Sequence, residues 1–516
     1  MSTINTNVQS MIAQRVLGNN TDQLNKQLER LSTGLRINSG KDDPAGLIAS
    51  ENLRSEEKSL QAAIGNAERA DQVMNIAEGG LKEVNSLLLE MQSLVTESAN
   101  DAGLSEEEKQ ANQLQVDSIL QSIDRISQTT SFQGTKLLNG SLDYTLSSQS
   151  SNVVEAQVNG AKLNHGETRD VQVTVTNSAQ HAGLFLSTGG SLDLSANGST
   201  TAPDQRFVME VAGSKGSREF SFASGTATSA MAAQINTYSD VLGVSAAASS
   251  GGSSGSSGVM LKSTEFGSDQ FVSVDIVDDG NQQAGSIQQL SATNEDVIDT
   301  GGGATTKLSA VTNPVRDDGQ DVEATVNGVT ATADGKKVEL NTAFLDIETT
   351  LDQSGAQNLQ TIDAFTITGG GAKFNVGPDV NITNQVSTGL QSVSSRSLGT
   401  NDTGFLDELA SSKSANVVDG DLNKAQKIVD QAIKQVSQLR GRIGAFQKNT
   451  LQPTINNLNV TMENTAAAES SIRDTDFAET TAELTRSQIL QSSAQNTLSI
   501  ANSQPRNVLS LLGGGG

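Results

Sequence analysis

Few residues of this chain have side chains suited to catalysis or metal binding. Histidine occurs only at His165 and His181, in a stretch rich in Gly, Ser and Thr where an ordinary surface role is expected. Cysteine is absent, which excludes disulfides, cysteine-ligated zinc and thiol catalysis. The sequence also contains no nucleophile elbow, no phosphate-binding P-loop and no His-Glu-x-x-His helix. Because it offers no catalytic constellation, we expect a protein that is not an enzyme.

Two acidic runs and two glycine runs resemble parts of ligand sites but lack their essential features. Asp278-Asp279-Gly280-Asn281 and Asp317-Asp318-Gly319 have neither the full spacing of a calcium loop nor its closing Glu. Residues 301–303 and 369–371 are glycine runs without the Lys-Ser/Thr ending of a P-loop, and we interpret them as turns. The sequence therefore predicts no bound metal and no cofactor.

The charge and composition of the chain exclude several kinds of partner. Its formal net charge of −25 over 516 residues argues against binding to nucleic acid or anionic membranes, which are themselves negatively charged. The N-terminus lacks the basic and apolar regions of a Sec signal peptide. No run reaches the ~18 apolar residues of a membrane span, so membrane insertion is not expected.

The elements that must position any functional surface are long helices, and the first lie near the N-terminus. The first helix carries a leucine seam with the four–three–four spacing of a coiled coil, at Leu24, Leu28, Leu31 and Leu35. A polar run at 39–46, with Pro44 and two glycines, ends it. A second helix of about 40 residues repeats the spacing at Met74, Ala77, Leu81, Val84, Leu88, Met91 and Val95. A third carries Val116, Ile119, Ile123 and Ile126.

Matching helices return near the C-terminus. One has its seam at Ala425, Val429, Ala432, Val436, Leu439, Ile443 and Phe446. Pro453 predicts a break or kink after it. The last helix presents a stripe at Leu490, Ala494, Leu498 and Ala501; Pro505 interrupts the pattern, and an apolar tail with Leu509 and Leu512 follows. Since a soluble monomer rarely leaves such a surface uncovered, these residues and the N-terminal leucines are predicted to pack between subunits.

The middle of the chain, from about residue 140 to 395, has the pattern of short strands. Residues 206–277 are interpreted as one small β-β-α-β-β unit. Asn327-Gly328 and Asp334-Gly335 are predicted hairpin turns. The fold class is therefore α+β, with paired N- and C-terminal coiled-coil or rod domains and a mainly β inserted outer region. Because both ends expose apolar stripes, non-closing contacts between copies would build a helical filament rather than a ring.

Several stretches at both ends resemble bacterial flagellin, the subunit of the flagellar filament. In the N-terminal part they are Ile4-Asn5-Thr6-Asn7, Leu31-Ser32-Thr33-Gly34-Leu35-Arg36-Ile37-Asn38-Ser39, Lys41-Asp42-Asp43-Pro44-Ala45-Gly46, Glu97-Ser98-Ala99-Asn100 and Phe132-Gln133-Gly134-Thr135-Lys136-Leu137-Leu138. In the C-terminal part they are Glu469-Ser470-Ser471-Ile472-Arg473-Asp474-Thr475-Asp476-Phe477-Ala478, Gln488-Ile489-Leu490-Gln491, Ala501-Asn502 and Asn507-Val508-Leu509-Ser510-Leu511-Leu512. Residues 206–277 also resemble a small repeat inserted in some flagellins and hook-associated proteins.

The resemblance implies a division of the chain, export unfolded through the flagellar type III channel, and a place in the extracellular flagellum. Partners that it implies are further copies of this chain, a flagellar export chaperone, the filament cap and hook-associated proteins. The implied divisions are 1–45, an N-terminal inner-layer helix; 46–150, the N-terminal half of the helical rod; 151–390, the β outer region; 391–465, the C-terminal half of the rod; and 466–516, a C-terminal inner-layer helix.

One departure from the family pattern concerns an innate-immune receptor. In many flagellins a polar and basic cluster on the long rod helix is bound by the Toll-like receptor that senses flagellin. The matching positions here are Leu89, Glu90 and Ser93. An acidic side chain at Glu90, where the family motif has arginine, is expected to weaken that contact.

The expected function is that of a structural subunit polymerising into the flagellar filament that propels swimming. A hook–filament junction protein is the nearest alternative, because such proteins share the paired termini. An enzyme displayed on the filament, with its site within 150–390, is a second alternative, which the lack of a catalytic constellation disfavours. A surface adhesin is a third, but it would not need helical seams at both ends.

Overall fold

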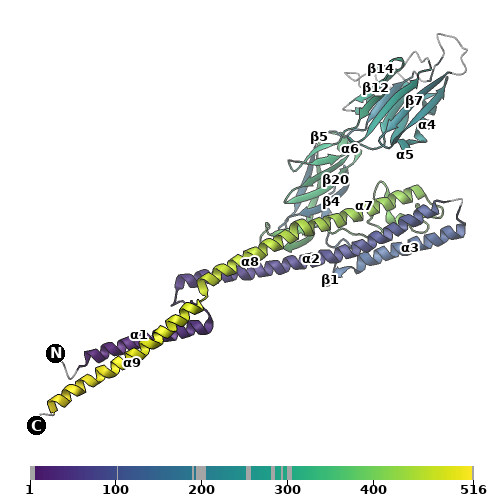
Figure 1. Cartoon of the computed structure of the whole chain (residues 1–516). Coiled ribbons are helices and arrows are strands. Elements are labelled where there is room, and N and C mark those ends of the chain that lie inside the picture. The colour runs from purple at the N-terminus through teal and green to yellow at the C-terminus, as the bar shows by residue number, and fades with distance from the viewer. Residues whose placement is uncertain are drawn as a thin grey trace. The chain divides into compact units, whose positions relative to one another are not determined.

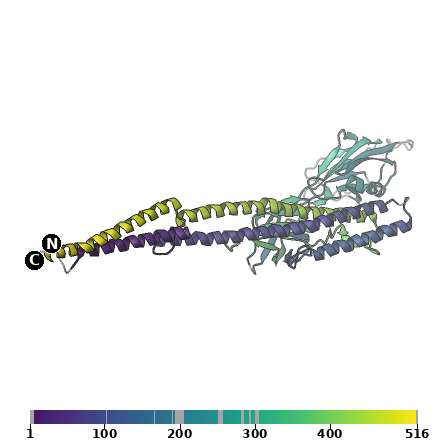
Figure 2. The same ribbon diagram turned by 60° about the horizontal axis from the view of Figure 1, so that its bottom comes forward.

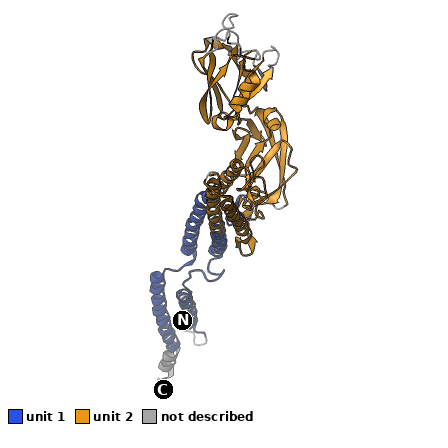
Figure 3. Cartoon of the chain, turned by 90° about the vertical axis from the view of Figure 1, so that its right-hand side faces the viewer, with its two compact units in different colours: residues 1–72, 374–385, 444–516 blue, residues 73–373, 386–443 orange. Residues whose placement is uncertain are grey.

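Figures 1 and 2 show the computed structural model of the chain. The structure describes residues 6–100, 103–164, 166–188, 191, 192, 194, 205–250, 257–280, 285–291, 294–298 and 305–513. The chain divides into two compact units (Figure 3). The first spans residues 1–72, 374–385 and 444–516, and the second spans residues 73–373 and 386–443.

The first unit contains two pairs of helices from opposite ends of the sequence. Helix α1 (Val8–Thr33) lies alongside α9 (Phe477–Gly513), as both Figure 1 and Figure 2 show. The first part of α2 (Pro44–Ser98) packs on α8 (Gln452–Arg473) through Leu60, Ala63, Ile64 and Leu458.

Helix α2 is 55 residues long, well beyond the length expected from its seam. Pro44 is its first residue, where the missing N–H of proline breaks no helical hydrogen bond. The next proline in the chain is Pro203. No proline therefore breaks the helix between its polar first turns and its apolar seam. The apolar spacing therefore located the packed part of the helix but not its start.

In the second unit the rest of α2 forms a helical bundle with α3 (Glu106–Thr129) and α7 (Leu422–Phe446). The predicted seams are confirmed, because the side chains that follow are all 0% exposed: Met74, Ala77, Leu81, Val84, Leu88, Met91, Ala425, Val429, Ala432 and Val436. The α-helix is interrupted close to Pro453, where a break or kink was predicted, although the chain does not leave the helical conformation. After α7 the chain continues through a π-helical turn (Gln447–Leu451) into α8, and this wider turn accommodates the proline.

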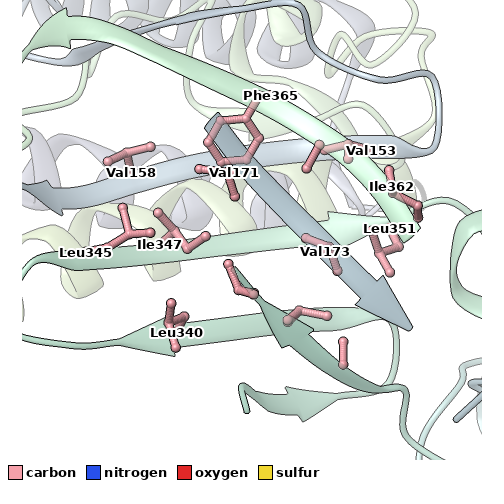
Figure 4. Packing of buried hydrophobic residues seen from close by; sticks show 14 of the residues in the cluster. Val153, Val158, Val171, Val173, Leu340, Leu345, Ile347, Leu351, Ile362 and Phe365 are labelled. Carbon is pink, nitrogen blue, oxygen red and sulfur yellow. The ribbon is translucent and has the colours of Figure 1, made fainter. Parts of the chain in front are cut away.

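Two antiparallel sheets share a core and form what we call the inner sandwich. Their strand orders are β17-β16-β5-β21-β3 and β18-β19-β20-β4. Side chains of both sheets, such as Val171 and Phe365 of one and Val158 and Ile347 of the other, meet in this core (Figure 4). The elements are β3 (Tyr144–Ser147), β4 (Val153–Ala161), β5 (Arg169–Asn177), β16 (Glu323–Val326), β17 (Val329–Thr330), β18 (Thr332–Asp334), β19 (Lys337–Asn341), β20 (Leu345–Leu351), α6 (Gln353–Gln357) and β21 (Thr361–Gly370).

A second pair of antiparallel sheets forms the outer sandwich, with the orders β13-β12-β6-β10-β9 and β15-β11-β7-β8; β14 also pairs with β12. It has its own core, which includes Phe207, Phe220 and Met231. The elements are β6 (Gly183–Ser187), β7 (Arg206–Gly213), β8 (Gly216–Ala223), α4 (Thr228–Asn236), α5 (Ser239–Leu242), β9 (Val244–Ser250), β10 (Ser257–Ser263), β11 (Phe271–Asp278), β12 (Ser286–Ser291), β13 (Asn294–Ile298), β14 (Thr305–Lys307), η2 (Leu308–Ala310) and β15 (Val315–Asp318).

The segment 206–277, expected to form one β-β-α-β-β unit, contributes to both outer sheets. Strands β7, β8 and β11 lie in one sheet, whereas β9 and β10 lie in the other. Strand β9 was not expected, because Val244-Ser245-Ala246-Ala247-Ala248 has little of the alternation that marks a strand. The sheets are completed by strands from outside the segment, namely β6, β12, β13, β14 and β15, so these residues fold together with their surroundings.

Hairpin turns and short elements complete the fold. The Asn327-Gly328 hairpin turn is confirmed: it joins β16 to β17, with φ of 49° at Asn327 and 81° at Gly328. The second turn is displaced by one residue, because Asp334 still pairs with Lys337 and Gly335-Lys336 form the loop. The remaining elements are β1 (Ser131–Phe132), β2 (Thr135–Lys136), β22 (Ala372–Asn375), β23 (Gln385–Thr388), β24 (Gly399–Thr400), β25 (Gly404–Phe405) and η3 (Leu406–Leu409).

Candidate assembly interface

The seam between α1 and α9 is built from small and polar side chains. Ser10 and Ala13 of α1 and Ser487 of α9 are buried. The side-chain amide of Asn7 donates to the carbonyl of Ala501 at 2.8 Å, and that of Asn20 donates to the carbonyl of Leu490 at 3.1 Å. Small side chains let the two helices approach closely, and the amides then fix their register along the pair.

The predicted packing residues occupy both the seam and the surface of this helix pair. Ala494 and Ala501 are buried, and Leu24, Leu31, Leu35 and Leu498 are half-buried. Leu28 and Leu490 stay 46% and 40% exposed. The side chains of Leu509 and Leu512 lie outside the described residues, although the backbone of α9 continues through Pro505 to Gly513. The proline therefore does not interrupt the helix.

A set of large apolar side chains remains uncovered on this helix pair. On α1 and α9 the exposed residues, between 40% and 65% accessible, are Val8, Met11, Ile12, Val16, Leu28, Phe477, Ile489, Leu490 and Ile500. We call these residues the terminal apolar surface. Val8, Ile12 and Val16 are four residues apart and share one helix face. A surface of this kind marks an interaction site rather than a stable solvent-facing exterior.

A compact joint next to this helix pair links the segment after α1 to the segment between α8 and α9. Gly34 ends α1 with φ of 72°, and its carbonyl accepts the amide of Thr475 at 3.0 Å. The amide of Arg36 donates to the carbonyl of Arg473 at 2.7 Å. Between these two hydrogen bonds, Leu35 and Asp474 form an antiparallel β-bridge. We call these contacts the terminal joint. The sequence motifs at both places carried the family resemblance but gave no sign that the two segments pair.

Charged side chains reinforce the terminal joint on both sides. Lys26 lies 3.1 Å from Asp42, and the Lys26 ammonium together with hydrogen bonds from Ser39 lowers the pKa of Asp42 to about 2. Arg473 lies 2.8 Å from Glu51, and that hydrogen bond lowers the pKa of the Glu51 carboxyl. The first ion pair thus holds the loop between α1 and α2 to α1, and the second holds α2 to the end of α8, beside the backbone pairing of the terminal joint.

The chain between the inner sandwich and α7 is fastened to α3 by polar contacts. Asp124 accepts hydrogen bonds from the amide and hydroxyl of Ser395 at 2.8 and 2.9 Å. Asp117 accepts from the amide and hydroxyl of Ser411. Buried Gln113 donates to the carbonyl of Leu409 and accepts from the amide of Val417. The stretch from Ser395 to Val417, which contains no α-helix, is therefore packed on α3.

The positions matched to the receptor-binding cluster lie together on α2. Leu89 is 50% exposed, and Glu90 and Ser93 are exposed as well. Leu89 and Ser93 are one helical turn apart and Glu90 adjoins them, so the three form one accessible patch.

The histidine and acidic residues that were considered as candidates for catalysis or metal binding make contacts within the fold. The His181 ring lies 3.7 Å from the Phe266 ring, and its Nδ1 is 3.1 Å from the Glu265 carbonyl; His165 lies outside the described residues. Asp317 accepts the amide of Gly183 at 2.7 Å, and burial raises the pKa of its carboxyl. Among the described residues there is no group of three or more His, Asp or Glu side chains that could hold a metal ion. In the same part of the chain, no helix is long and apolar enough to cross a membrane.

Comparisons with known proteins agree with the arrangement of the two ends. The bacterial flagellin N-terminal helical region matches residues 4–143, and the bacterial flagellin C-terminal helical region matches residues 426–512. A flagellin of Salmonella choleraesuis is 29% identical over 99% of both chains. Flagellin B of Helicobacter pylori is 26% identical over 99% of both chains. Polar flagellin F of Vibrio parahaemolyticus is 46% identical over 27% of this chain and 36% of that protein.

Proposed function

This chain belongs to the bacterial flagellin family, and from that premise we propose how its termini build a filament. The protein is a structural subunit that polymerises into the flagellar filament. In our proposal the terminal apolar surface of one copy is covered by neighbouring copies. The observation that carries this is the exposure of Met11, Ile489 and Ile500, which are 62–65% accessible on helices whose mutual seam is already closed.

The proposed division of labour follows the chain. Residues 1–45 and 466–516 form the inner layer, 46–150 and 391–465 form the rod, and 151–390 face outward. The predicted packing residues then act at two levels. Ala494 and Ala501 hold α9 to α1 within one subunit, while Leu28, Leu490, Leu509 and Leu512 contact neighbouring subunits.

A polar substitution within the terminal apolar surface tests this proposal. Ile489→Gln with Ile500→Gln should leave the fold intact, because both side chains are exposed in the single chain. In the proposed filament, neighbouring copies bury these two isoleucines. Losing them should weaken assembly by about 2–4 kcal/mol, which raises the critical concentration roughly thirtyfold or more. Sedimentation and electron microscopy of polymerising protein would measure this.

Leu359→Gln is the matched control, since Leu359 is 68% exposed but lies in the inner sandwich region. It should polymerise as the unaltered chain does. Deleting residues 488–512 should leave a soluble monomer that cannot polymerise. Normal filaments from either the double variant or the truncated chain would contradict the role given to α9.

We also propose that the chain is exported to the extracellular flagellum and that its partners include an export chaperone, the filament cap and hook-associated proteins. Its family and the unpaired apolar C-terminal surface support this, because a chaperone would have to cover that surface before assembly. No enzymatic activity is proposed. Finding the protein in sheared extracellular filaments, and its retention inside cells lacking flagellar export, would test the location.

The exposed patch of Leu89, Glu90 and Ser93 supports a further proposal, weak activation of the flagellin-sensing Toll-like receptor. Glu90→Arg restores the basic residue of the family motif and should raise the potency in a reporter-cell assay by about tenfold, the effect of one favourable charged contact. Glu56→Arg, also exposed on α2, should change nothing. Potency of the unaltered chain equal to that of an enteric flagellin would refute the proposal.

A further inference from the structure

Asn-Gly steps are chemically labile points in a protein, and this chain has four of them. They begin at Asn139, Asn159, Asn197 and Asn327, and Asn197 lies outside the described residues. The glycine nitrogen can attack the side-chain carbonyl carbon of the asparagine because no Cβ obstructs its approach. The attack is fastest where the glycine N–H and the asparagine side chain are held by few hydrogen bonds.

Folding holds the asparagines of two of these steps. The Asn327 side chain accepts the amide of Gln172 at 2.9 Å and donates to the carbonyl of Asp170 at 3.1 Å, and its own amide donates to the carbonyl of Gln172. Asn159 lies within β4, where its side chain contacts Gln157 at 2.9 Å and Asp346 at 3.3 Å. Neither side chain can rotate towards the following glycine without breaking hydrogen bonds.

The Asn139-Gly140 step is held by fewer hydrogen bonds than the other two. Asn139 is exposed in a turn, and its Oδ1 accepts a single hydrogen bond, from the amide of Ser141 at 3.1 Å. Within the described part of the chain, neither the Asn139 Nδ2 nor the Gly140 N–H donates a hydrogen bond. Gly140 has φ of 85°, a conformation that glycine adopts without strain. Both the nucleophile and the leaving group are therefore unengaged.

We propose that Asn139-Gly140 is a site of spontaneous deamidation in the folded protein. The Gly140 nitrogen forms a bond to Cγ of Asn139 and loses its proton. The Cγ–Nδ2 bond breaks, and ammonia leaves with that proton, giving a five-membered succinimide. Water then opens the ring at either carbonyl and yields aspartate or isoaspartate, so the chain gains one negative charge and needs no further reactant.

The surroundings of this step make the product consequential. Leu138 is fully buried, and its carbonyl accepts the amide of Val393 at 3.0 Å and the hydroxyl of Ser127 at 2.7 Å. On the other side, Leu142 forms a β-bridge with Leu390. Isoaspartate adds one backbone carbon between these two anchors. The modification should therefore loosen the pairing of residues 138–142 with residues 390–393.

Peptide mass spectrometry of the full-length protein, aged at mildly alkaline pH, tests the proposal. In the folded protein Asn139 should deamidate at least about tenfold faster than Asn159 or Asn327, because releasing either of those side chains breaks hydrogen bonds. In the chain unfolded in urea the three steps should react at similar rates. Equal rates in the folded protein, or equal protection of Asn139 by folding, would overturn the proposal.

A second measurement tests the consequence. Hydrogen exchange of residues 138–142 and 390–393 should speed up in aged protein and stay slow in aged Asn139→Gln, whose longer side chain disfavours the five-membered ring. Asn139→Asp supplies the charge without the extra backbone carbon and should exchange like the fresh protein. Exchange in aged protein no faster than in Asn139→Asp would show that isoaspartate does not loosen the pairing.

Discussion

At the scale of single residues, the terminal joint depends on a few polar side chains. Asp42 accepts from the amide and hydroxyl of Ser39 at 3.1 and 3.0 Å while it faces Lys26. These contacts close the loop between α1 and α2 so that Gly34 and Arg36 can pair with the C-terminal segment. Arg36 adds a side-chain hydrogen bond to the carbonyl of Ile472 at 2.6 Å.

Asp42→Asn should therefore loosen the terminal joint, at a cost of about 1 kcal/mol, as for an ion pair partly in water. The pKa of Asp42 is about 2 in the folded chain, below its ordinary value of 3.8. Its stabilising effect is thus fully present above 3.8 and is lost as the pH falls through about 2. Hydrogen exchange of residues 34–43 at neutral pH and near pH 2 would measure both effects. Asp43→Asn is the neighbouring control, and a variant difference that persists undiminished at the lower pH would contradict this account.

At the scale of elements, α3 offers a test of local sequence chemistry. Ser105 and Glu108 form a reciprocal capping box, with the Ser105 hydroxyl accepting the Glu108 amide at 3.3 Å and Glu108 accepting the Ser105 amide at 2.8 Å. Ser105→Ala should destabilise the rod by about 1 kcal/mol, seen as a lower thermal midpoint. Ser86→Ala, at an exposed position inside α2, should be neutral or slightly stabilising. Equal effects of the two would show that the cap contributes nothing.

Elements with large apolar residues at fixed spacing could be predicted from the sequence, and the fold class is confirmed. The rod seams were predictable because Met74, Leu81 and Leu88 leave a periodic signal. The α1–α9 seam was only partly so, because Ser10, Ala13 and Ser487 resemble surface residues until two distant helices meet. Strand β9 could not be predicted for a similar reason, since its small residues show no alternation of apolar and polar side chains. Pro453 follows a widened helical turn and Pro505 lies inside α9, so neither proline ends the helical backbone, which proline residues alone do not reveal.

At the scale of the second unit, one cation on the rod faces the inner sandwich. Burial lowers the pKa of the Arg442 guanidinium on α7 even though the carboxylates of Asp143, Asp346 and Glu348 attract it. Burial likewise raises the pKa of Asp143 and of Asp346. Arg442 thus supplies positive charge where acidic groups of the β region approach the rod.

Arg442→Gln should weaken the packing of the inner sandwich on α7, because it removes the positive charge that faces the partly buried carboxylates of Asp143 and Asp346, at a cost of about 2 kcal/mol. Calorimetry should show a lower unfolding midpoint, and limited proteolysis should cut more readily near residues 388–398. Lys434→Gln, on the exposed face of the same helix, removes the same charge without that setting and should have little effect. Matching stability losses in the two variants would rule out a specific role for Arg442.

The bridge between Leu142 and Leu390 has a consequence for engineering. The polypeptide enters the β region and leaves it at this pair, where the backbones are about 5 Å apart. The two backbone positions between which the β-strands are inserted are therefore adjacent in space. A domain whose own termini are neighbours could be inserted between Leu142 and Leu390, and each subunit of the filament would then display one copy of it.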